Sequence, residues 1–204
     1  MAARIPTRCN DDDRYFSDRW QCMPAAGYSA LFEQLLRHPG ITLQLHTGFD
    51  AVRGLGLAPH TTHTIYTGAI DAYFGHGLGP PPYRSLRFAH QHLAGVAQFR
   101  PVGTVNYPNT EVYTRITEFK HLTGLQVAGT SVVREYPHAN GEPDYQIPRP
   151  ENEALYQCYA ALADVEAGVS FVGRLAQYRY YNVDQVIAAA MALRERLLAT
   201  AETA

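Results

Sequence analysis

Apolar and polar residues alternate along this chain with periods that predict both helices and strands. Apolar residues at helical spacing from Tyr28 to Arg37, followed by His38-Pro39-Gly40, predict a helix with a Pro/Gly stop. After it, the pattern and the Gly/Pro positions predict a series of short elements: a strand at 41–46, a strand at 62–66, one helical turn at 70–74 and an irregular loop at 75–82.

The middle of the chain is rich in short β-prone runs. They lie near 85–88, 102–107, 113–120 and 131–136 and are joined by turn-prone segments, which predicts an antiparallel meander. In the third run, alternation places Tyr113, Arg115, Thr117 and Phe119 on one face, with Thr114, Ile116, Glu118 and Lys120 on the other. Arg115 therefore shares a face with aromatic rings. It could bind an anion there or extend its charge to solvent from a sheet edge.

The last third alternates helix, strand and helix. Pro148 to Pro150 introduces a predicted helix over 151–164, with Leu155, Tyr159 and Leu162 on one stripe. A short buried strand is predicted at 169–172 and a final helix at 184–198.

Between that strand and the final helix lies the segment richest in candidate chemistry, Gly173 to Val186. It combines a glycine turn, two arginines, three tyrosines and a helix N-terminus, whose first N–H groups lack intrahelical partners and favour negative charge. An anion or an electron-rich cofactor ring suits such a junction. The alternative is an ordinary strand-turn-helix connection with surface tyrosines.

Composition and net charge limit the classes of partner that we expect for this protein. The 204 residues are 46% hydrophobic and 18% charged, enough for a globular core. Lys+Arg 17 against Asp+Glu 19 leaves a formal charge of -2, so we expect no nucleic-acid partner and only a local anion site. No apolar run is long enough to insert into a membrane, and we expect a cytoplasmic protein. Cys9, Cys22 and Cys158 are odd in number and scattered, which fits a reducing compartment.

Several short patterns do not amount to motifs. The glycine-rich runs at 54–59 and 75–80 do not lie between a strand and a helix, as a dinucleotide-binding loop must. His60-Thr-Thr-His63 and His90-Gln-His92 lack a third ligand at metal-binding spacing, so we expect no metal. No Gly-x-Ser-x-Gly sequence singles out a side-chain nucleophile.

What stands out instead is a supply of arginines and tyrosines in segments that could converge. Arginines neutralise diphosphates through charge-assisted bonds, while tyrosines offer hydroxyl donors and flat faces for a sugar or base. In chemical terms this describes a site for a sugar nucleotide. The residues concerned are Arg8, Tyr15, Arg84, Arg115, Tyr145 and Tyr180.

In these segments the sequence resembles the UDP-galactopyranose mutase family. The resemblance is carried, in order, by Arg4-Ile-Pro-Thr-Arg, Tyr15-Phe-Ser-Asp-Arg, Ile65-Tyr-Thr-Gly, Tyr83-Arg-Ser-Leu, Val105-Asn-Tyr-Pro-Asn, Tyr113-Thr-Arg-Ile-Thr-Glu, Pro148-Arg-Pro-Glu-Asn, Gly173-Arg-Leu and Tyr180-Tyr-Asn-Val-Asp-Gln-Val. It implies an isomerase that interconverts UDP-galactopyranose and UDP-galactofuranose. Reduced FAD would be the catalyst, forming a sugar adduct at flavin N5, so that no side chain acts as nucleophile.

The resemblance also assigns roles to individual residues. Substrate binding would fall to Arg8, Tyr15, Asn106, Arg115, Tyr145 and Tyr180, with the two arginines on the diphosphate. Cofactor binding would fall to Arg84, Gly173, Arg174, Tyr181, Asn182, Val183, Asp184, Gln185 and Val186. In this assignment the first turn of the final helix faces the flavin ring.

The implied fold class is α/β (α+β), an antiparallel substrate-domain sheet beside the remaining strands and C-terminal helix of a Rossmann-like FAD domain. Residues 1–82 would begin the substrate lobe, 83–147 would form its sheet and 148–204 would complete the FAD domain. The match corresponds to the C-terminal portion of the family, without its glycine-rich FAD-binding segment. We therefore expect either a part of a mutase or an inert fragment that binds a sugar nucleotide or a protein partner. Exposed apolar surface would favour a homo-oligomer.

Overall fold

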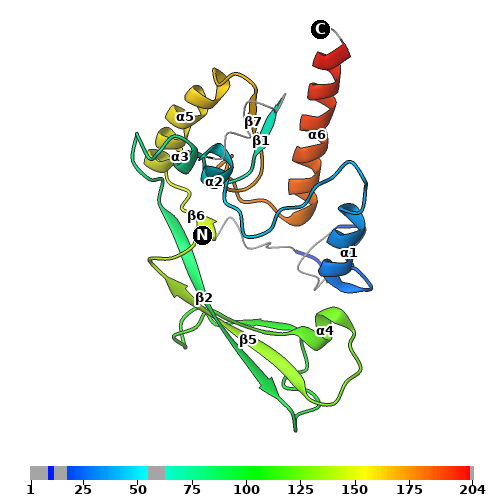
Figure 1. The fold of residues 1–204 in the computed structure, drawn as a ribbon. Coiled ribbons are helices and arrows are strands. Elements are labelled where there is room, and N and C mark those ends of the chain that lie inside the picture. The colour runs from blue at the N-terminus through cyan, green and yellow to red at the C-terminus, as the bar shows by residue number, and fades with distance from the viewer. Residues whose placement is uncertain (1–8, 12–17, 55–62, 203–204) are drawn as a thin grey trace. The chain divides into compact units, whose positions relative to one another are not determined.

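The computed structural model describes residues 9–11, 18–54 and 63–202. The chain divides into two compact units, one built from residues up to 45 with 92–103 and 118–131, the other from 46–91, 104–117 and 132–204. The observed elements are mixed helices and strands, as the sequence predicts (Figure 1). The linear division at residues 82 and 147 stays a prediction.

The first unit contains helices α1 (Gly27–Leu35) and α4 (Phe119–Thr123). Helix α1 confirms the predicted helix, but none of its residues is buried. The predicted strand at 41–46 is wrong: residues 41–45 form no strand, and Ile41, Leu43 and Leu45 are exposed. Alternating apolar residues form a strand only where a neighbouring strand supplies hydrogen-bond partners. None of the strands in the described part of the chain pairs with residues 41–45.

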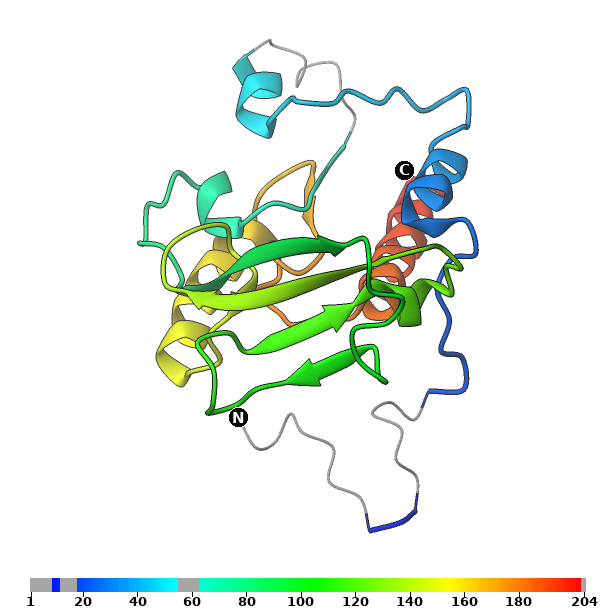
Figure 2. The ribbon, with the colours of Figure 1, turned by 90° about the horizontal axis from the view of Figure 1, so that it is seen from below.

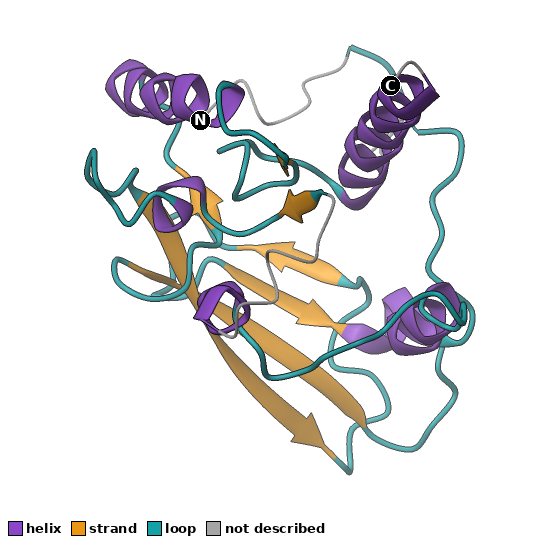
Figure 3. Cartoon of the chain, turned by 45° about the horizontal axis from the view of Figure 1, so that its top comes forward, coloured by secondary structure: helices purple, strands orange, loops and turns teal. Residues whose placement is uncertain are grey.

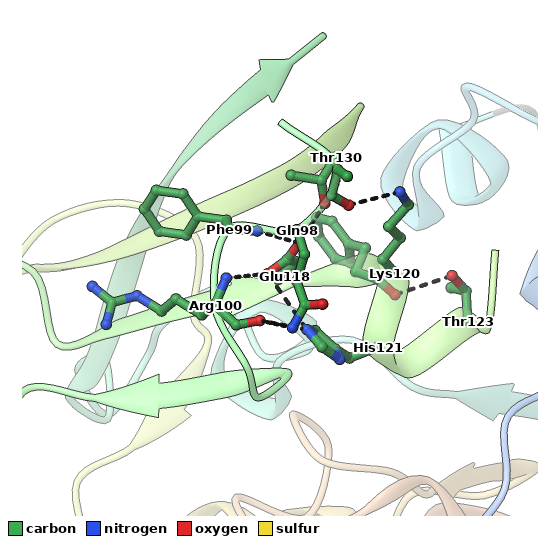
Figure 4. Close-up of polar contacts among 10 residues, drawn as sticks. Gln98, Phe99, Arg100, Glu118, Lys120, His121, Thr123 and Thr130 are labelled. Carbon is green, nitrogen blue, oxygen red and sulfur yellow. Dashed lines mark hydrogen bonds and ion pairs between the residues drawn. The ribbon is translucent and has the colours of Figure 1, made fainter. Parts of the chain in front are cut away.

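A buried carboxylate organises the other part of the first unit (Figure 4). Glu118 is 1% exposed and accepts hydrogen bonds from the Phe99 and Arg100 backbone N–H groups, at 2.9 and 2.8 Å. The Thr130 hydroxyl donates a third, at 2.7 Å. Nearby, Lys120 Nζ donates to the carbonyls of Ala97 and Val127. These bonds tie two loops to the start of α4.

The second unit holds most of an antiparallel sheet. Its strands are β2 (Tyr83–Leu93), β3 (Thr104–Asn106), β4 (Arg115–Glu118), β5 (Thr130–His138) and β6 (Tyr145–Gln146), and their order is β3-β4-β5-β2-β6. Figure 2 shows the long strands β2 and β5 side by side. The predicted meander holds for β3, β4 and β5 only. Strand β2 lies beside β5 rather than β3, so the connection from β2 to β3 bypasses two strands.

The third β-prone run is shorter than the sequence pattern predicts. Strand β4 ends at Glu118, and Phe119 and Lys120 begin helix α4. Alternation also fails to separate a buried face from an exposed one, since Ile116, Thr117 and Glu118 are all buried.

The rest of the second unit surrounds a small parallel sheet (Figure 3). Strands β1 (Thr64–Tyr66) and β7 (Val169–Phe171) pair in parallel, in register Thr64 to Val169. Helices α2 (Phe49–Gly54), α3 (Ile70–Tyr73), α5 (Pro150–Asp164) and α6 (Val183–Glu202) accompany them. The predicted elements at 70–74, 151–164, 169–172 and 184–198 are confirmed, although β7 is only half-buried.

An aromatic core closes this part of the second unit. Its rings, in mutual contact at centroid distances between 4.9 and 6.0 Å, are Phe49, Tyr66, Tyr73, Phe74, Tyr159 and Phe171. Tyr159 is fully buried, and its hydroxyl donates to the Gly79 carbonyl at 3.0 Å while accepting from the Leu78 N–H at 2.9 Å. The predicted 75–82 loop is thereby held against α5.

Candidate functional site

Arg174 lies at the centre of an aromatic and cationic cluster in the second unit. Its guanidinium carbon is 5.4 Å from the ring centroid of Tyr145 and 5.3 Å from that of Tyr180. The two rings are stacked, 5.8 Å apart at an interplanar angle of 17°. One guanidinium N–H donates to the Asp144 carbonyl at 2.7 Å. Two tyrosines from distant segments therefore share one cation, an arrangement that combines flat faces, hydroxyl groups and positive charge.

The turn after β7 places Arg174 there. Gly173 has φ +102°, a backbone conformation that L-residues rarely adopt, and the turn ends at Tyr178, with φ +44°. The Tyr178 hydroxyl donates to the Pro82 carbonyl at 2.6 Å and accepts from the Ile147 N–H at 3.3 Å. One buried tyrosine thus fixes the turn against the segments that precede β2 and follow β6.

Asp144 holds the other side of the cluster. Its carboxylate accepts from the Leu86 N–H at 2.6 Å, and its own N–H donates to the Arg84 carbonyl at 3.1 Å. Because its carbonyl also receives Arg174, Asp144 joins β2, β6 and the Gly173 turn. Sequence reasoning missed this residue, since a single acidic residue beside a tyrosine carries no distinctive pattern.

A second cation, Arg115, lies at the start of β4. Its Nε donates to Asn106 Oδ1 at 2.9 Å, and the two residues face each other in the β3–β4 register. Its guanidinium is 3.6 Å from Glu135 Oε1, and the side chains are 41% and 13% exposed. The aromatic neighbour of Arg115 in the sequence, Tyr113, contacts Tyr107 and Tyr136 instead. Arg115 is therefore held by polar partners and keeps part of its guanidinium accessible.

Both Arg115 and Arg174 influence the pKa of the Tyr145 hydroxyl. Burial raises the pKa of its hydroxyl, and the neighbouring Tyr180 and Glu135 raise it further. Arg115 and Arg174 both act in the opposite direction, so the charges of both reach this hydroxyl. Tyr145 remains a protonated donor at neutral pH, with two cations beside it that favour an anion as the acceptor.

A cavity of about 570 Å³ opens beside this cluster. Arg84 and Tyr145, paired across β2 and β6, both line it. Thr114, Pro137 and His138 line it as well. A hollow of this size suits a small-molecule ligand or part of a larger one.

The start of α6 is open to solvent. The residues from Asn182 to Gln185 are exposed, and Tyr181 and Val186 are half-buried. Gln185 Oε1 accepts the Asn182 N–H at 2.8 Å, half of a capping box, and Asp184 contributes a negative charge to the first turn. A Cβ added to Gly173 would meet no atom within 4 Å. The backbone at this junction is therefore approachable.

Among the substrate and cofactor residues predicted from sequence, the structure places Arg174, Tyr145 and Tyr180 in mutual contact. Arg174, assigned to the cofactor, contacts Tyr145 and Tyr180, assigned to the substrate. Arg84 lies across the strand pair from Tyr145. Arg8 and Tyr15 fall outside the described residues. Asp144, Glu135, Thr114, His138 and Tyr178 join the site through pairing across strands or turns, which the linear pattern does not reveal.

Nowhere in the described ranges do three or more His, Cys, Asp or Glu side chains group so that they could hold a metal ion. His63 and His92 each make a hydrogen bond to a serine hydroxyl, Ser170 and Ser131 respectively. Cys9, Cys22 and Cys158 are exposed free thiols. Along the described part of the chain, no helix combines the length and apolar character needed to cross a bilayer.

Comparison with known proteins identifies the family. The family model for UDP-galactopyranose mutase matches residues 1–180. A probable UDP-galactopyranose mutase of Klebsiella pneumoniae is 34% identical over 202 residues, 97% of this chain and 51% of the relative. A dTDP-fucopyranose mutase of Escherichia coli is 30% identical over 191 residues, 90% of this chain and 50% of the relative. A UDP-galactopyranose mutase of Mycoplasma pneumoniae is 32% identical over 214 residues, 97% of this chain and 53% of the relative.

The chain thus spans about half the length of these curated relatives. The family match nevertheless runs through both units and includes Arg84, Arg115, Tyr145, Arg174 and Tyr180. It covers well over half of the chain. The chain therefore belongs to the UDP-galactopyranose mutase family.

Proposed function

We propose that this chain is the C-terminal portion of a flavin-dependent UDP-galactopyranose mutase, interconverting UDP-galactopyranose and UDP-galactofuranose. The observation that carries the proposal is the convergence of Arg174, Tyr145 and Tyr180. The charge of Arg115 acts with that of Arg174 to lower the pKa of the Tyr145 hydroxyl, against the effect of burial. Two cations and two phenols beside a cavity match the chemistry of a nucleotide diphosphate. The family membership supplies the reaction.

In this proposal the diphosphate lies between Arg115 and the Tyr145–Tyr180 pair. Asn106 holds the Arg115 guanidinium through its Oδ1 and leaves its own amide N–H groups to donate to the ligand. Glu135 limits the reach of Arg115, while the accessible part of the guanidinium meets a phosphate oxygen.

The residues of the Gly173–Val186 segment fit one side of a flavin. The exposed first turn of α6 offers N–H groups to an electron-rich ring, and the open space at Gly173 lets the ring approach the backbone. The carboxylate of Asp184 in the first turn of α6 would repel a negatively charged ligand at this terminus. Binding of the flavin ring there would therefore depend on hydrogen bonds and stacking rather than on charge. When bound, reduced FAD supplies the nucleophile that attacks the sugar. Arg84 and Arg174 would then balance the charges of cofactor and diphosphate.

The first experiment asks whether the purified chain carries or accepts FAD. We expect the chain to show flavin absorbance after incubation with FAD. For the activity test, the chain is joined to the half of the Klebsiella relative that lies outside the matched region. After reduction with dithionite, we expect this joined protein to convert UDP-galactofuranose to UDP-galactopyranose. A joined protein that binds flavin and UDP but converts nothing would refute the mutase assignment. A chain that binds neither FAD nor UDP in either form would support an inert fragment.

The similarity to a dTDP-fucopyranose mutase raises the question of which nucleotide the site prefers. We expect UDP to compete for the site more strongly than dTDP, and titration of the joined protein with both nucleotides would measure the preference. Tighter binding of dTDP would move the proposed substrate to a deoxyhexose nucleotide.

A further inference from the structure

The antiparallel sheet carries two further arginines on the face turned away from the candidate site. Arg87 lies three residues after Arg84 in β2, and Arg134 precedes Glu135 in β5. Because side chains alternate along a strand, Arg87 points away from the face of Arg84, and Arg134 points away from the face of Glu135. Strands β2 and β5 are neighbours in the sheet (Figure 2). The two arginines therefore belong to a surface separate from the candidate site.

On this face, two guanidinium groups and two phenol rings lie in a row. The guanidinium carbon of Arg87 is 4.0 Å from the ring centroid of Tyr136. The Tyr136 ring meets Tyr113 edge to face, with the centroids 5.9 Å apart. The guanidinium carbon of Arg134 is 5.9 Å from the Tyr113 centroid. We call these four residues the arginine–tyrosine row, and a third ring, that of Tyr107, packs on Tyr113 at 5.1 Å.

The cations of the arginine–tyrosine row can take an anionic partner. Arg87 is exposed, and none of the ion pairs between described residues includes it. Its contact with Tyr136 covers one face of the guanidinium, so the N–H groups at the edge can still donate. Arg134 donates one N–H to a neutral acceptor, Gln91 Oε1, at 2.8 Å. A guanidinium is weakly hydrated, so an anion replaces its water at low cost.

The rings give this surface the composition of a protein–protein interface. Tyrosine and arginine are enriched in such interfaces and supply much of their binding energy. Tyr107, Tyr113 and Tyr136 are half-buried, so part of each ring is accessible. Val112, next to Tyr113, is 78% exposed and adds apolar surface. A peptide segment uses these groups better than a lone ion does, because apolar surface stabilises a complex only when the partner covers it.

We propose that the arginine–tyrosine row binds an extended acidic segment of a partner protein, with one carboxylate at each arginine and an apolar side chain over the rings between them. Two rings separate the guanidinium groups, so a single carboxylate does not reach both. Carboxylates four residues apart on an extended chain lie on one face, ~13 Å from each other. That separation does not exceed the span that the three contacts of the row allow.

The experiment measures binding of an acidic probe peptide to the purified chain. The probe is a fluorescein-labelled peptide with blocked termini that contains the sequence Glu-Thr-Val-Thr-Glu. We expect saturable binding by fluorescence anisotropy, which weakens as the salt concentration rises. The same peptide with glutamine in place of both glutamates should bind at least about tenfold more weakly, because charge-assisted hydrogen bonds to the arginines are lost. This comparison needs no change in the protein, so it does not depend on how a variant folds.

Substitutions in the chain locate the binding surface. Arg87→Gln with Arg134→Gln removes both cations and keeps side-chain stems beside the rings, and it should weaken binding of the glutamate peptide by at least about tenfold. Arg87→Lys with Arg134→Lys keeps the charges and should restore part of the affinity. Arg37→Gln with Arg149→Gln, at exposed positions outside the row, removes the same charge and should leave the affinity unchanged. Circular dichroism checks that each variant folds.

The outcomes separate this inference from the proposed function. Loss of binding in the glutamine variant of the row, but not in the control variant, supports the proposal, whether or not the chain binds UDP. Equal binding of the two peptides, an unchanged affinity in the glutamine variant, or the absence of saturable binding overturns it. Competition between UDP and the peptide overturns it as well, because the peptide would then occupy the candidate site. Self-association of the chain that disappears in the glutamine variant would make the row an interface between copies instead.

Discussion

At the scale of single residues, the candidate site depends on side chains that hold one another in place. Arg174 is held by the Asp144 carbonyl and by two tyrosine rings, and Arg115 by Asn106 and Glu135. Each guanidinium therefore makes some of its hydrogen bonds within the protein. Its remaining N–H donors are held in fixed directions, so less side-chain entropy is lost when a ligand binds.

Replacement of Arg115 tests its place in the site. Arg115→Ala removes a partly exposed cation, and we expect UDP to bind about 10- to 100-fold more weakly to the joined protein, as for loss of one hydrogen bond to a charged group. Arg115→Lys keeps the charge but loses the directed Nε bond to Asn106, so it should restore only part of the affinity. Isothermal titration with UDP measures both effects.

The control for this change is Arg87→Ala. Arg87 lies 4.0 Å from the Tyr136 ring centroid and has no assigned role in the site. Equal losses of UDP affinity in the two alanine variants would refute the role of Arg115.

Glu118 gives a pH prediction at the same scale. Burial raises the pKa of its carboxyl, but the hydrogen bonds from Phe99, Thr130 and Arg100 outweigh burial and hold the pKa below its usual value of 4.5. Because the folded-state pKa is depressed, the stabilisation is present above the unfolded pKa and is lost as the pH falls through the folded one. Wild-type stability should therefore fall as the pH drops below about 4.5, and in Glu118→Gln this component should be missing.

Urea unfolding between pH 3 and pH 7 measures the free energy of unfolding of both proteins. At pH 7 we expect Glu118→Gln to cost about 1–3 kcal/mol, since the amide places N–H groups against N–H donors. Glu33→Gln, at an exposed position of α1, is the matched control and should change little. If the two variants lose equal stability at pH 7, the buried carboxylate does not organise its unit.

At the scale of elements, the connection between β7 and α6 decides where the site forms. A strand followed by a helix is visible in the sequence, but the turn between them contains both a left-handed glycine and a left-handed tyrosine. Tyr178 keeps this conformation because its hydroxyl is bonded on two sides and its ring packs on Tyr83 and Tyr156. The turn thus directs Arg174 toward Tyr145 rather than toward solvent.

Gly173→Ala tests the turn. A Cβ there meets open space, so the cost is backbone strain alone, which we expect to be about 1–2 kcal/mol in the free energy of unfolding. Gly95→Ala also meets open space, but its φ is outside the left-handed region, and it should be neutral or slightly stabilising. Thermal unfolding of both variants measures the difference. Equal melting temperatures would show that the turn does not require glycine.

At the scale of the whole molecule, the formal charge of -2 excludes a strong overall field. Three of the 17 basic residues, Arg84, Arg115 and Arg174, belong to the candidate site. Because long-range steering needs a net field, the rate at which UDP associates should change by less than about threefold between low and physiological salt. Stopped-flow measurements on the joined protein test this. If the association rate of UDP falls steeply as the salt concentration rises, the basic surface around the site is larger than the described residues form.

The longer helices were the most predictable part of the fold. Those at 27–35, 150–164 and 183–202 follow local apolar spacing and Pro/Gly stops, which act over a few residues. The short helices α2 and α4 were not predicted from the sequence. The strand at 41–46 failed, and β4 ended early at Glu118, because strands depend on neighbours that are distant in the sequence. For the same reason, the position of β2 beside β5 could not be derived from the order of the runs.

By itself, the sequence determined the types of most elements, the local character of the charge, and the motifs that relate this chain to the mutases. Only the tertiary structure decided that Arg174 meets Tyr145 and Tyr180, and that Asp144 and Tyr178 fix them there. The physical reason is range. Helix periods, caps and stops are local, whereas a site made from a strand edge, a turn and a hairpin forms when long-range pairing brings their side chains together.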